Sequence, residues 1–315
     1  METHAEQQAA NSGALLDHQY NTKVPKEQLG DLLIERRAPY LIRLAVILPL
    51  LAGLHWLIAT NEPGWWLLPI YAVIGFILSG LMVLAHEMSH FHLIRHKKLN
   101  LAVGTVFALP LAVPYALYGI AHLKHHAFNT TNKDPSHYDR PRFKIVHYLA
   151  LITHYTYLTF FMSLFSGLEQ LFVSNMKGVK PNNYQITLVT LQYSTIVAFL
   201  LLAPEAWLWH FLLPLIAFAF WNTVRAIGEH EYLYMGEEGH KYPLETTRSM
   251  RMGPLTSFFW WNAGYHIEHH LYPSIPFHNL PQLCSMLKLE PLQKMNYLQY
   301  MGYRFKRGVE YPMYF

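Results

Sequence analysis

The chain has 315 residues, of which 52% are apolar and only 14% are charged, whereas soluble domains average about 25% charged residues. Its aromatic content of 15% and mean hydropathy of +0.11 indicate membrane-embedded segments joined to parts that lie in water. The net charge of +4 is not gathered into a basic stripe, so no nucleic-acid partner is expected. The single cysteine, Cys284, excludes metal sites that need two or more thiolates.

Three parts are expected along the chain. Residues 1–40 are polar and mixed in charge and lack the features of a signal peptide, which predicts a cytoplasmic N-terminal arm. Residues 41–290 contain all the long apolar stretches and are expected to form one membrane domain. Residues 291–315 are expected to form a cytoplasmic C-terminal tail.

Four stretches are long and apolar enough to cross a ~30 Å hydrocarbon core, which takes about 20 residues of helix. These stretches are 41–60, 66–85, 185–203 and 206–224. Short connections join the first to the second and the third to the fourth. The sequence therefore predicts an all-α, multi-pass membrane protein with two helical hairpins, each of which returns to the side from which it started.

The positive charges agree with this topology. No Lys or Arg lies between Arg43 and Arg95, or between Lys180 and Arg225. The positive-inside rule then places the ends of the hairpins, with everything attached to them, in the cytoplasm. The compact chain favours a bacterial inner membrane.

Two further apolar stretches, 99–121 and 148–173, are predicted to be interfacial or re-entrant helices. Pro110 and Pro114 interrupt the first, and proline disturbs a helix interior. If residues 99–121 crossed the membrane, the histidine clusters on either side of them would face opposite compartments.

Histidine is the unusual residue, with 20 copies, and three clusters follow apolar segments. The first is His86-x-x-x-His90, and the other two have the form His-x-x-His-His. The histidines of these two clusters are His122, His125 and His126, and His266, His269 and His270.

The spacing of these clusters suits a helix, because residues at i, i+3 and i+4 share one face. Each cluster thus presents two or three imidazoles in one direction, and imidazole is a common ligand of iron and zinc. A single such cluster arises easily by chance, but three in one chain are far better explained by metal binding. Eight converging imidazoles are too many for one metal ion and suitable for two, in a histidine-rich cap over the spans.

Other residues are weaker candidates for the same site. His230 follows the fourth span and is predicted to be a ninth ligand, although it also suits an interfacial surface position. Asn262 lies one helical turn before His266 and is a candidate ligand, with a helix cap or turn as the alternative. Ligating histidines usually donate their second ring N–H to a carboxylate or carbonyl, so acids beside the clusters are candidate partners. These acids are Glu87, Asp134, Glu229 and Glu268.

The clusters resemble the three histidine boxes of the membrane fatty acid desaturase superfamily, which also contains hydroxylases and other monooxygenases. The resemblance is carried by His122-Leu-Lys-His125-His126 with residues 129–135, and by His266-Ile-Glu-His269-His270 with residues 271–281. It extends over residues 30–290 and is most specific at the boxes.

This resemblance implies a non-haem diiron enzyme, with two iron ions held by the box histidines and the extra His230, and with O2 as co-substrate. It implies an apolar lipid or fatty-acyl substrate that enters from the membrane. We expect the reaction to be desaturation, and hydroxylation is the alternative. No electron-carrier module is recognisable in the chain, so electrons are expected from a separate ferredoxin, rubredoxin or cytochrome b5 type of protein. The run Phe258 to Trp261 is expected to anchor at the membrane interface rather than line the substrate path.

Two other classes of protein stay open. His86-Glu87-x-x-His90 matches the zinc metalloprotease pattern, with Glu87 as general base. That alternative predicts one zinc ion and leaves the other two clusters unexplained. A metal transporter or sensor would need polar residues inside the spans, and the four spans contain few.

Overall fold

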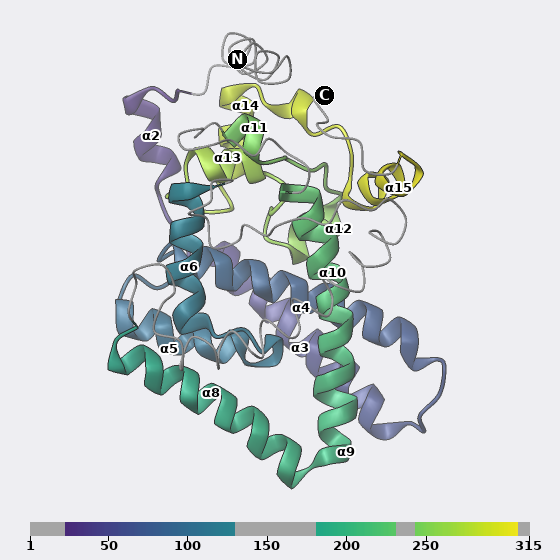
Figure 1. Ribbon diagram of the computed structural model, residues 1–315. Coiled ribbons are helices and arrows are strands. Elements are labelled where there is room, and N and C mark those ends of the chain that lie inside the picture. The colour runs from purple at the N-terminus through teal and green to yellow at the C-terminus, as the bar shows by residue number, and fades with distance from the viewer. Residues whose placement is uncertain (1–22, 130–180, 231–242, 308–315) are drawn as a thin grey trace, which may run out of the picture.

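The computed structural model describes residues 23–129, 181–230 and 243–307, and every regular element within these ranges is a helix (Figure 1). The long helices are α3 Ala38–Thr60, α4 Leu67–Ser89, α5 Lys97–Ala108, α6 Tyr115–Phe128, α8 Asn183–Leu202 and α10 Leu213–His230. The short helices are α2 Lys26–Leu32, α9 Pro204–Trp207, α11 Pro243–Thr246, α12 Pro254–Phe259, α13 His266–Leu271, α14 Leu280–Leu287 and α15 Tyr297–Arg307. Single turns complete the set, namely η1 Leu109–Leu111, η2 Leu208–Leu212 and η3 Glu290–Leu292.

Four of these helical segments are long and apolar enough to cross a membrane, which confirms the predicted multi-pass, all-α class. They are α3, α4, α8 and the continuous run Pro204–His230, in which α9 and the π-helical turn η2 precede α10. Each agrees with a predicted span, but α4 continues to Ser89 and α10 to His230. These extensions place His86 and His230 on the same rigid helices that cross the membrane.

The apolar stretch 99–121 is broken, as its prolines predict. Lys97–Leu111 and Tyr115–Phe128 meet at an angle of 97°. Ala112 lies at the break with a left-handed φ of 51°, and Pro114 precedes the first turn of α6. Residues 148–173, the other predicted interfacial helix, lie outside the described ranges.

Helices α4 and α10 form the centre of the spans. The apolar window of α4 is 67% buried, whereas that of α3 is 22% buried and that of α8 is 28% buried. Gly75 of α4 lies directly against Ala217 of α10, where a side-chain Cβ would come within 2.6 Å of the Ala217 carbonyl oxygen. Because glycine has no Cβ, the two helices approach closely and hold a fixed mutual position.

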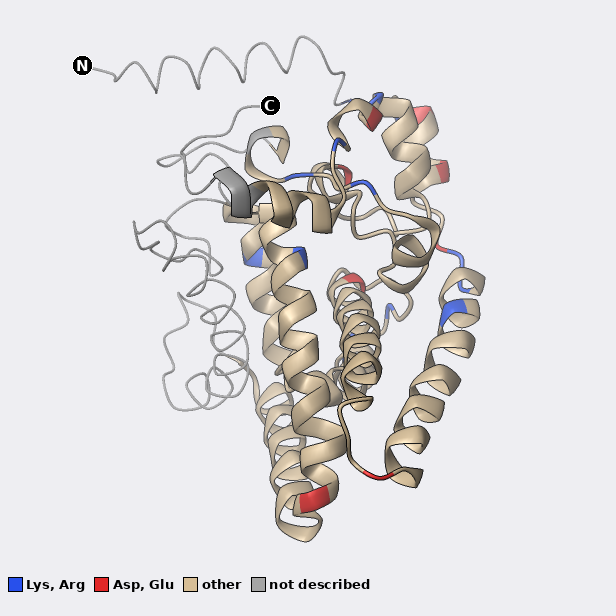
Figure 2. Ribbon diagram, turned by 90° about the vertical axis from the view of Figure 1, so that its right-hand side faces the viewer, with Lys and Arg blue, Asp and Glu red and all other residues tan. Residues whose placement is uncertain are grey.

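The remaining short helices form a cap over one end of the spans (Figures 1 and 2). In Figure 2 the Lys and Arg segments of the described chain lie in the upper half with the cap, and the lower end carries acidic segments alone. Those acidic segments include the connection after α3 and the start of α9, which contain Glu62 and Glu205.

The two tryptophans of the aromatic run before the third histidine box belong to the core. Trp260 and Trp261 are 1% and 0% exposed, and Trp260 donates its ring N–H to the Phe76 carbonyl of α4 at 2.9 Å. The expectation that this run anchors at the membrane interface is therefore wrong for both tryptophans. Their bulk instead fixes the loop that leads into α13 against the centre of the spans.

Candidate metal centre

Nine histidines from four helices meet where the spans enter the cap. They are His86 and His90 at the end of α4, His122, His125 and His126 on α6, His230 at the end of α10, and His266, His269 and His270 on α13. These residues are the eight box histidines and the predicted ninth. The structure brings all nine together, although helix α13 lies some 140 residues beyond α6 in the sequence.

A tight loop before helix α13 sets the direction of this helix. Trp261 and Asn262 have φ values of 50° and 57°, in the left-handed region that non-glycine residues rarely occupy. Buried contacts stabilise this conformation, because the Asn262 amide donates to the Phe277 carbonyl at 3.0 Å and accepts from the Ser257 hydroxyl. The loop thereby turns the third box toward the ends of α4 and α6.

The first histidine group consists of His86, His90, His122, His126 and His269. The Nε2 atom of His122 lies 2.9 Å from the Nε2 atoms of both His90 and His126. The Nε2 atom of His126 is also 3.1 Å from that of His269. Four of these imidazoles therefore point their Nε2 atoms at one small volume, and a ring nitrogen of His86 lies within 4.8 Å of them.

The second histidine group is defined here as His125, His230 and His270, together with His266, which lies in an overlapping set with His230 and Glu229. The Nε2 atoms of His266 and His230 are 2.7 Å apart, and the ring of His270 lies 4.6 Å from that of His266. The two groups adjoin each other, because the ring centroids of His126 and His270 are only 4.2 Å apart.

Each His-x-x-His-His box is divided between the two groups. On α6, His122 and His126 serve the first group and His125 serves the second. On α13, His269 serves the first group and His266 and His270 serve the second. The single helix face expected from the spacing thus contributes imidazoles to both groups.

The donor set fits metal ions better than it fits hydrogen bonds alone. Two imidazole nitrogens that bind one ion at about 2.0–2.1 Å, with an angle of about 90° between them at the ion, lie about 3 Å apart. The Nε2 pairs His90–His122 and His126–His269 are 2.9 Å and 3.1 Å apart. A ring nitrogen either carries a proton or offers a lone pair, so the Nε2 of His122 cannot serve two neighbouring Nε2 atoms well. Among the described residues, the buried Nε2 atoms of His86 and His270 also lack a hydrogen-bond partner.

The protonation state of the histidines suits ligation. Burial lowers the pKa of His266, His269 and His270 well below the ordinary 6.5, and neighbouring positive or imidazole groups lower it further. A lowered pKa means that these imidazoles are neutral at physiological pH. A neutral imidazole offers the lone pair that a metal requires.

Each group has a buried carboxylate on the Nδ1 side of one of its ligands. Glu87 Oε1 is 3.8 Å from His86 Nδ1, and Glu229 Oε2 is 3.7 Å from His266 Nδ1. Both carboxylates are nearly inaccessible, at 2% and 0% exposure, which excludes a surface role for them. Such partners orient metal-binding imidazoles and make them better donors.

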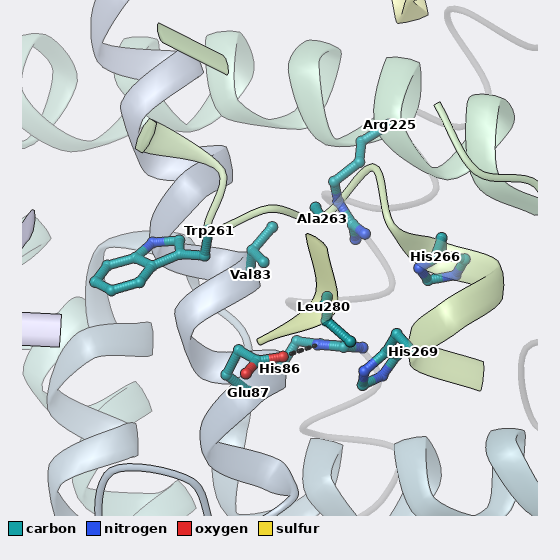
Figure 3. Close-up of a pocket in the computed structure, with 9 residues that line it drawn as sticks. All are labelled: Val83, His86, Glu87, Arg225, Trp261, Ala263, His266, His269 and Leu280. Carbon is teal, nitrogen blue, oxygen red and sulfur yellow. Dashed lines mark ion pairs between the residues drawn. The ribbon is translucent and has the colours of Figure 1, made fainter. Parts of the chain in front are cut away.

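A small cavity lies between the groups, and Figure 3 shows His86, His269 and His266 on its wall with Arg225 above them. The His86 side chain points toward His269 across the cavity, with a ring-centroid separation of 4.5 Å. Glu87 lies behind His86, joined to it by the dashed contact in the figure. The close-up thus places one carboxylate beside the ligand cluster rather than within it.

The other candidate residues from the sequence lie outside the two histidine groups or outside the described residues. The Asn262 amide is used within its own loop, so its role as a ligand stays a prediction. His92 is buried beside the Pro273 carbonyl, and His278 accepts from the Arg36 backbone, outside both groups. His55 and His210 face each other within the spans, with their Nδ1 atoms 3.1 Å apart. Asp134 lies outside the described residues.

Two contributors to the site were not assigned a role from the sequence. Arg225 donates to Glu229 Oε2 at 2.5 Å, and Tyr297 donates its hydroxyl to Glu229 Oε1 at 2.8 Å. The i, i+4 spacing of Arg225 and Glu229 on a helix is a signal that was available. Nothing near Tyr297 in the sequence indicates that it reaches the site.

Comparison with known proteins assigns the chain to a family. Residues 63–302 match the family model described as fatty acid desaturase. The chain is 25% identical over 244 residues to a chloroplastic omega-6 fatty acid desaturase of Glycine max, a match that covers 70% of this chain and 56% of that protein. It is 25% identical over 262 residues to an sn-1 acyl-lipid omega-3 desaturase (ferredoxin) of Nostoc sp., covering 76% and 72% of the two chains.

A third relative gives the same result. The sn-1 oleoyl-lipid 12-desaturase of Arthrospira platensis is 23% identical over 264 residues, which covers 75% of this chain and 72% of that protein. The chain spans about half the length of the chloroplastic relatives that it matches. The family model covers most of the described membrane domain and all three boxes. The chain therefore belongs to the fatty acid desaturase family.

Proposed function

We propose that this protein is a membrane-bound non-haem diiron oxygenase that uses O2 to introduce a double bond into a fatty-acyl or lipid chain. The observation that carries the proposal is the division of nine histidines into two adjacent groups. A chain of the fatty acid desaturase family with two such groups has the ligands for two ions of a metal that suits imidazole, and iron is one.

The protein's part in such a reaction follows from the site. The first group would hold one iron ion and the second group the other, and bound iron would supply the activation of O2 and the removal of hydrogen from an unactivated C–H bond. Glu87 and Glu229 would orient His86 and His266 through their Nδ1 atoms. The buried walls would keep the site dry and fix the substrate chain beside it.

The surroundings support a lipid substrate and a cytoplasmic site. The histidine groups include His86 and His230, at the ends of the apolar spans α4 and α10, so we expect an acyl chain to approach the site from the membrane. Lys and Arg gather at the same end, and the positive-inside rule assigns that end to the cytoplasm. One similar protein is named for its use of ferredoxin, and a basic cap suits a separate, acidic electron carrier of the ferredoxin, rubredoxin or cytochrome b5 type.

The geometry argues against the metalloprotease alternative. Glu87 Oε2 accepts the Phe277 backbone N–H at 3.0 Å, and its other oxygen lies on the Nδ1 side of His86. A general base of a zinc protease must instead face water on the metal, at the Nε2 side of its ligands. In addition, His86 and His90 share their group with three histidines from other helices.

The test is lipid analysis of cells that express the full chain with a matching electron donor, beside His269→Ala and His92→Ala variants. His269 belongs to the first group, whereas His92 is equally buried but lies outside both groups. We expect a new unsaturated acyl chain with the wild type and His92→Ala, and none with His269→Ala. A hydroxylated product with the same dependence would make the protein a hydroxylase, and no change in any lipid would contradict the proposal.

A further inference from the structure

Tyr297 brings the last described helix into contact with the second histidine group. It is the first residue of α15 and is only 4% exposed. Its hydroxyl donates a 2.8 Å hydrogen bond to Glu229 Oε1, across 68 positions of sequence. A buried hydroxyl that is bonded to a buried carboxylate beside metal-type ligands is a specific arrangement rather than incidental surface contact.

The ring of Tyr297 is held firmly enough to fix where its hydroxyl points. It packs edge-on against the buried Trp260, with ring centroids 5.0 Å apart. On its other side it lies on α10 at Gly228, where a Cβ atom would come within 2.8 Å of the ring. The missing side chain at Gly228 therefore makes the space in which the tyrosine ring lies.

Glu229 is held at both oxygens. Oε1 accepts from Tyr297, and Oε2 accepts from Arg225 Nη1 at 2.5 Å and lies 3.7 Å from His266 Nδ1. Two donors at separate oxygens fix the plane of a carboxylate, whereas one donor leaves it free to rotate. With this plane fixed, Oε2 faces Nδ1 of His266.

We propose that Tyr297 is a positioning residue for the second metal. By fixing Glu229, it keeps a carboxyl oxygen facing Nδ1 of His266 at 3.7 Å, which favours the tautomer with N–H at Nδ1 and the lone pair at Nε2, the atom that lies 2.7 Å from His230 Nε2. Metal retention at the second group thereby depends on the docking of α15, whereas metal retention at the first group does not. This inference rests on the proposed metal binding but concerns retention of the metal rather than the reaction.

The test compares Tyr297→Phe with Tyr300→Phe in the iron-loaded, full-length protein. Both changes remove one hydroxyl from a buried tyrosine of α15, and only the first removes the hydrogen bond to Glu229. The measurement is the rate at which each iron ion is lost to a chelator, with the Mössbauer spectrum recorded before and after. Loss of an outer partner typically costs about 10–100-fold in metal affinity, so we expect one of two irons to leave Tyr297→Phe at least about 10-fold faster.

The outcomes separate this inference from the proposed function. If the wild type and Tyr297→Phe lose both irons at the same rate, or if Tyr300→Phe loses iron as fast as Tyr297→Phe, the positioning role is wrong. If the wild type never holds two irons, the proposed function fails first.

A double-mutant cycle with Glu229→Gln tests the route of the effect. If Tyr297 acts through Glu229, adding Tyr297→Phe to Glu229→Gln should change iron release little further. Independent, additive effects would contradict the proposed route. Should the Glu229 variant not fold, because it leaves the partly buried Arg225 without its carboxylate, the comparison of the two tyrosines still decides the matter.

Discussion

The two histidine groups are built differently. The first takes four of its five histidines from α4 and α6, which contact each other directly, and only His269 from the cap. The second takes its histidines from α6, α10 and α13, and its outer carboxylate is held by α15. The first group is thus mostly a property of neighbouring helices, whereas the second exists only when the cap is assembled on the spans.

This difference suggests that the two metal positions have unequal tolerance to change. Removal of one imidazole leaves four in the first group and three in the second. The second group therefore loses the larger share of its ligands when one imidazole is removed. The predictions below run from the largest expected effect to the smallest.

Loss of a ligand should have the largest effect and should differ between the groups. We expect His230→Ala to release iron from its group much faster than the wild type, since only three imidazoles remain there. We expect His86→Ala to retain iron at reduced affinity, although both variants should lose more than the ~10–100-fold in activity that removal of an outer partner costs. Metal analysis after chelator treatment distinguishes the two variants. Equal iron loss from both would contradict the expected difference between the two histidine groups.

Removal of the outer carboxylate of the first group should have an intermediate effect. Glu87→Gln keeps the size of the side chain but replaces the carboxyl group beside His86 Nδ1 with an amide. We expect iron affinity at the first group to fall by about 10–100-fold while the second iron stays bound. Competitive metal titration measures this, and loss of the second iron instead would show that Glu87 serves the other group.

A change in the spans should mainly affect stability. Gly75→Ala inserts a methyl group between α4 and α10, the helices that end in His86 and His230. Such overpacking costs about 1–3 kcal/mol, so we expect a lower unfolding midpoint in detergent with both irons still bound. Gly53→Ala on the lipid-facing helix α3 is the matched control, because nothing lies within 4 Å of its added Cβ. Equal destabilisation by the two changes would show that close packing at Gly75 is unimportant.

Much of the fold is readable from local sequence. Apolar length alone places all four spans, and the prolines near residue 112 account for the break between α5 and α6. The spacing of the boxes predicts which imidazoles share a helix face. In each case the governing physics, namely helix geometry and the cost of polar groups in lipid, acts within one segment of chain.

The rest depends on contacts between distant segments. Spacing cannot reveal that His125 and His126 belong to different histidine groups, because that depends on how α10 and α13 lie against α6. The aromatic pair Trp260 and Trp261 has the composition of an interfacial anchor, and only tertiary packing buries it. Tyr297 reaches Glu229 from the last described helix, with no local pattern to mark it.

The most direct test of the central claim is the metal stoichiometry of the purified full-length protein from iron-replete cells, with Mössbauer spectroscopy to identify the iron. Two separate histidine groups predict about two non-haem iron ions per chain. One tightly held metal ion per chain, with no second ion after addition of ferrous iron, would contradict the account.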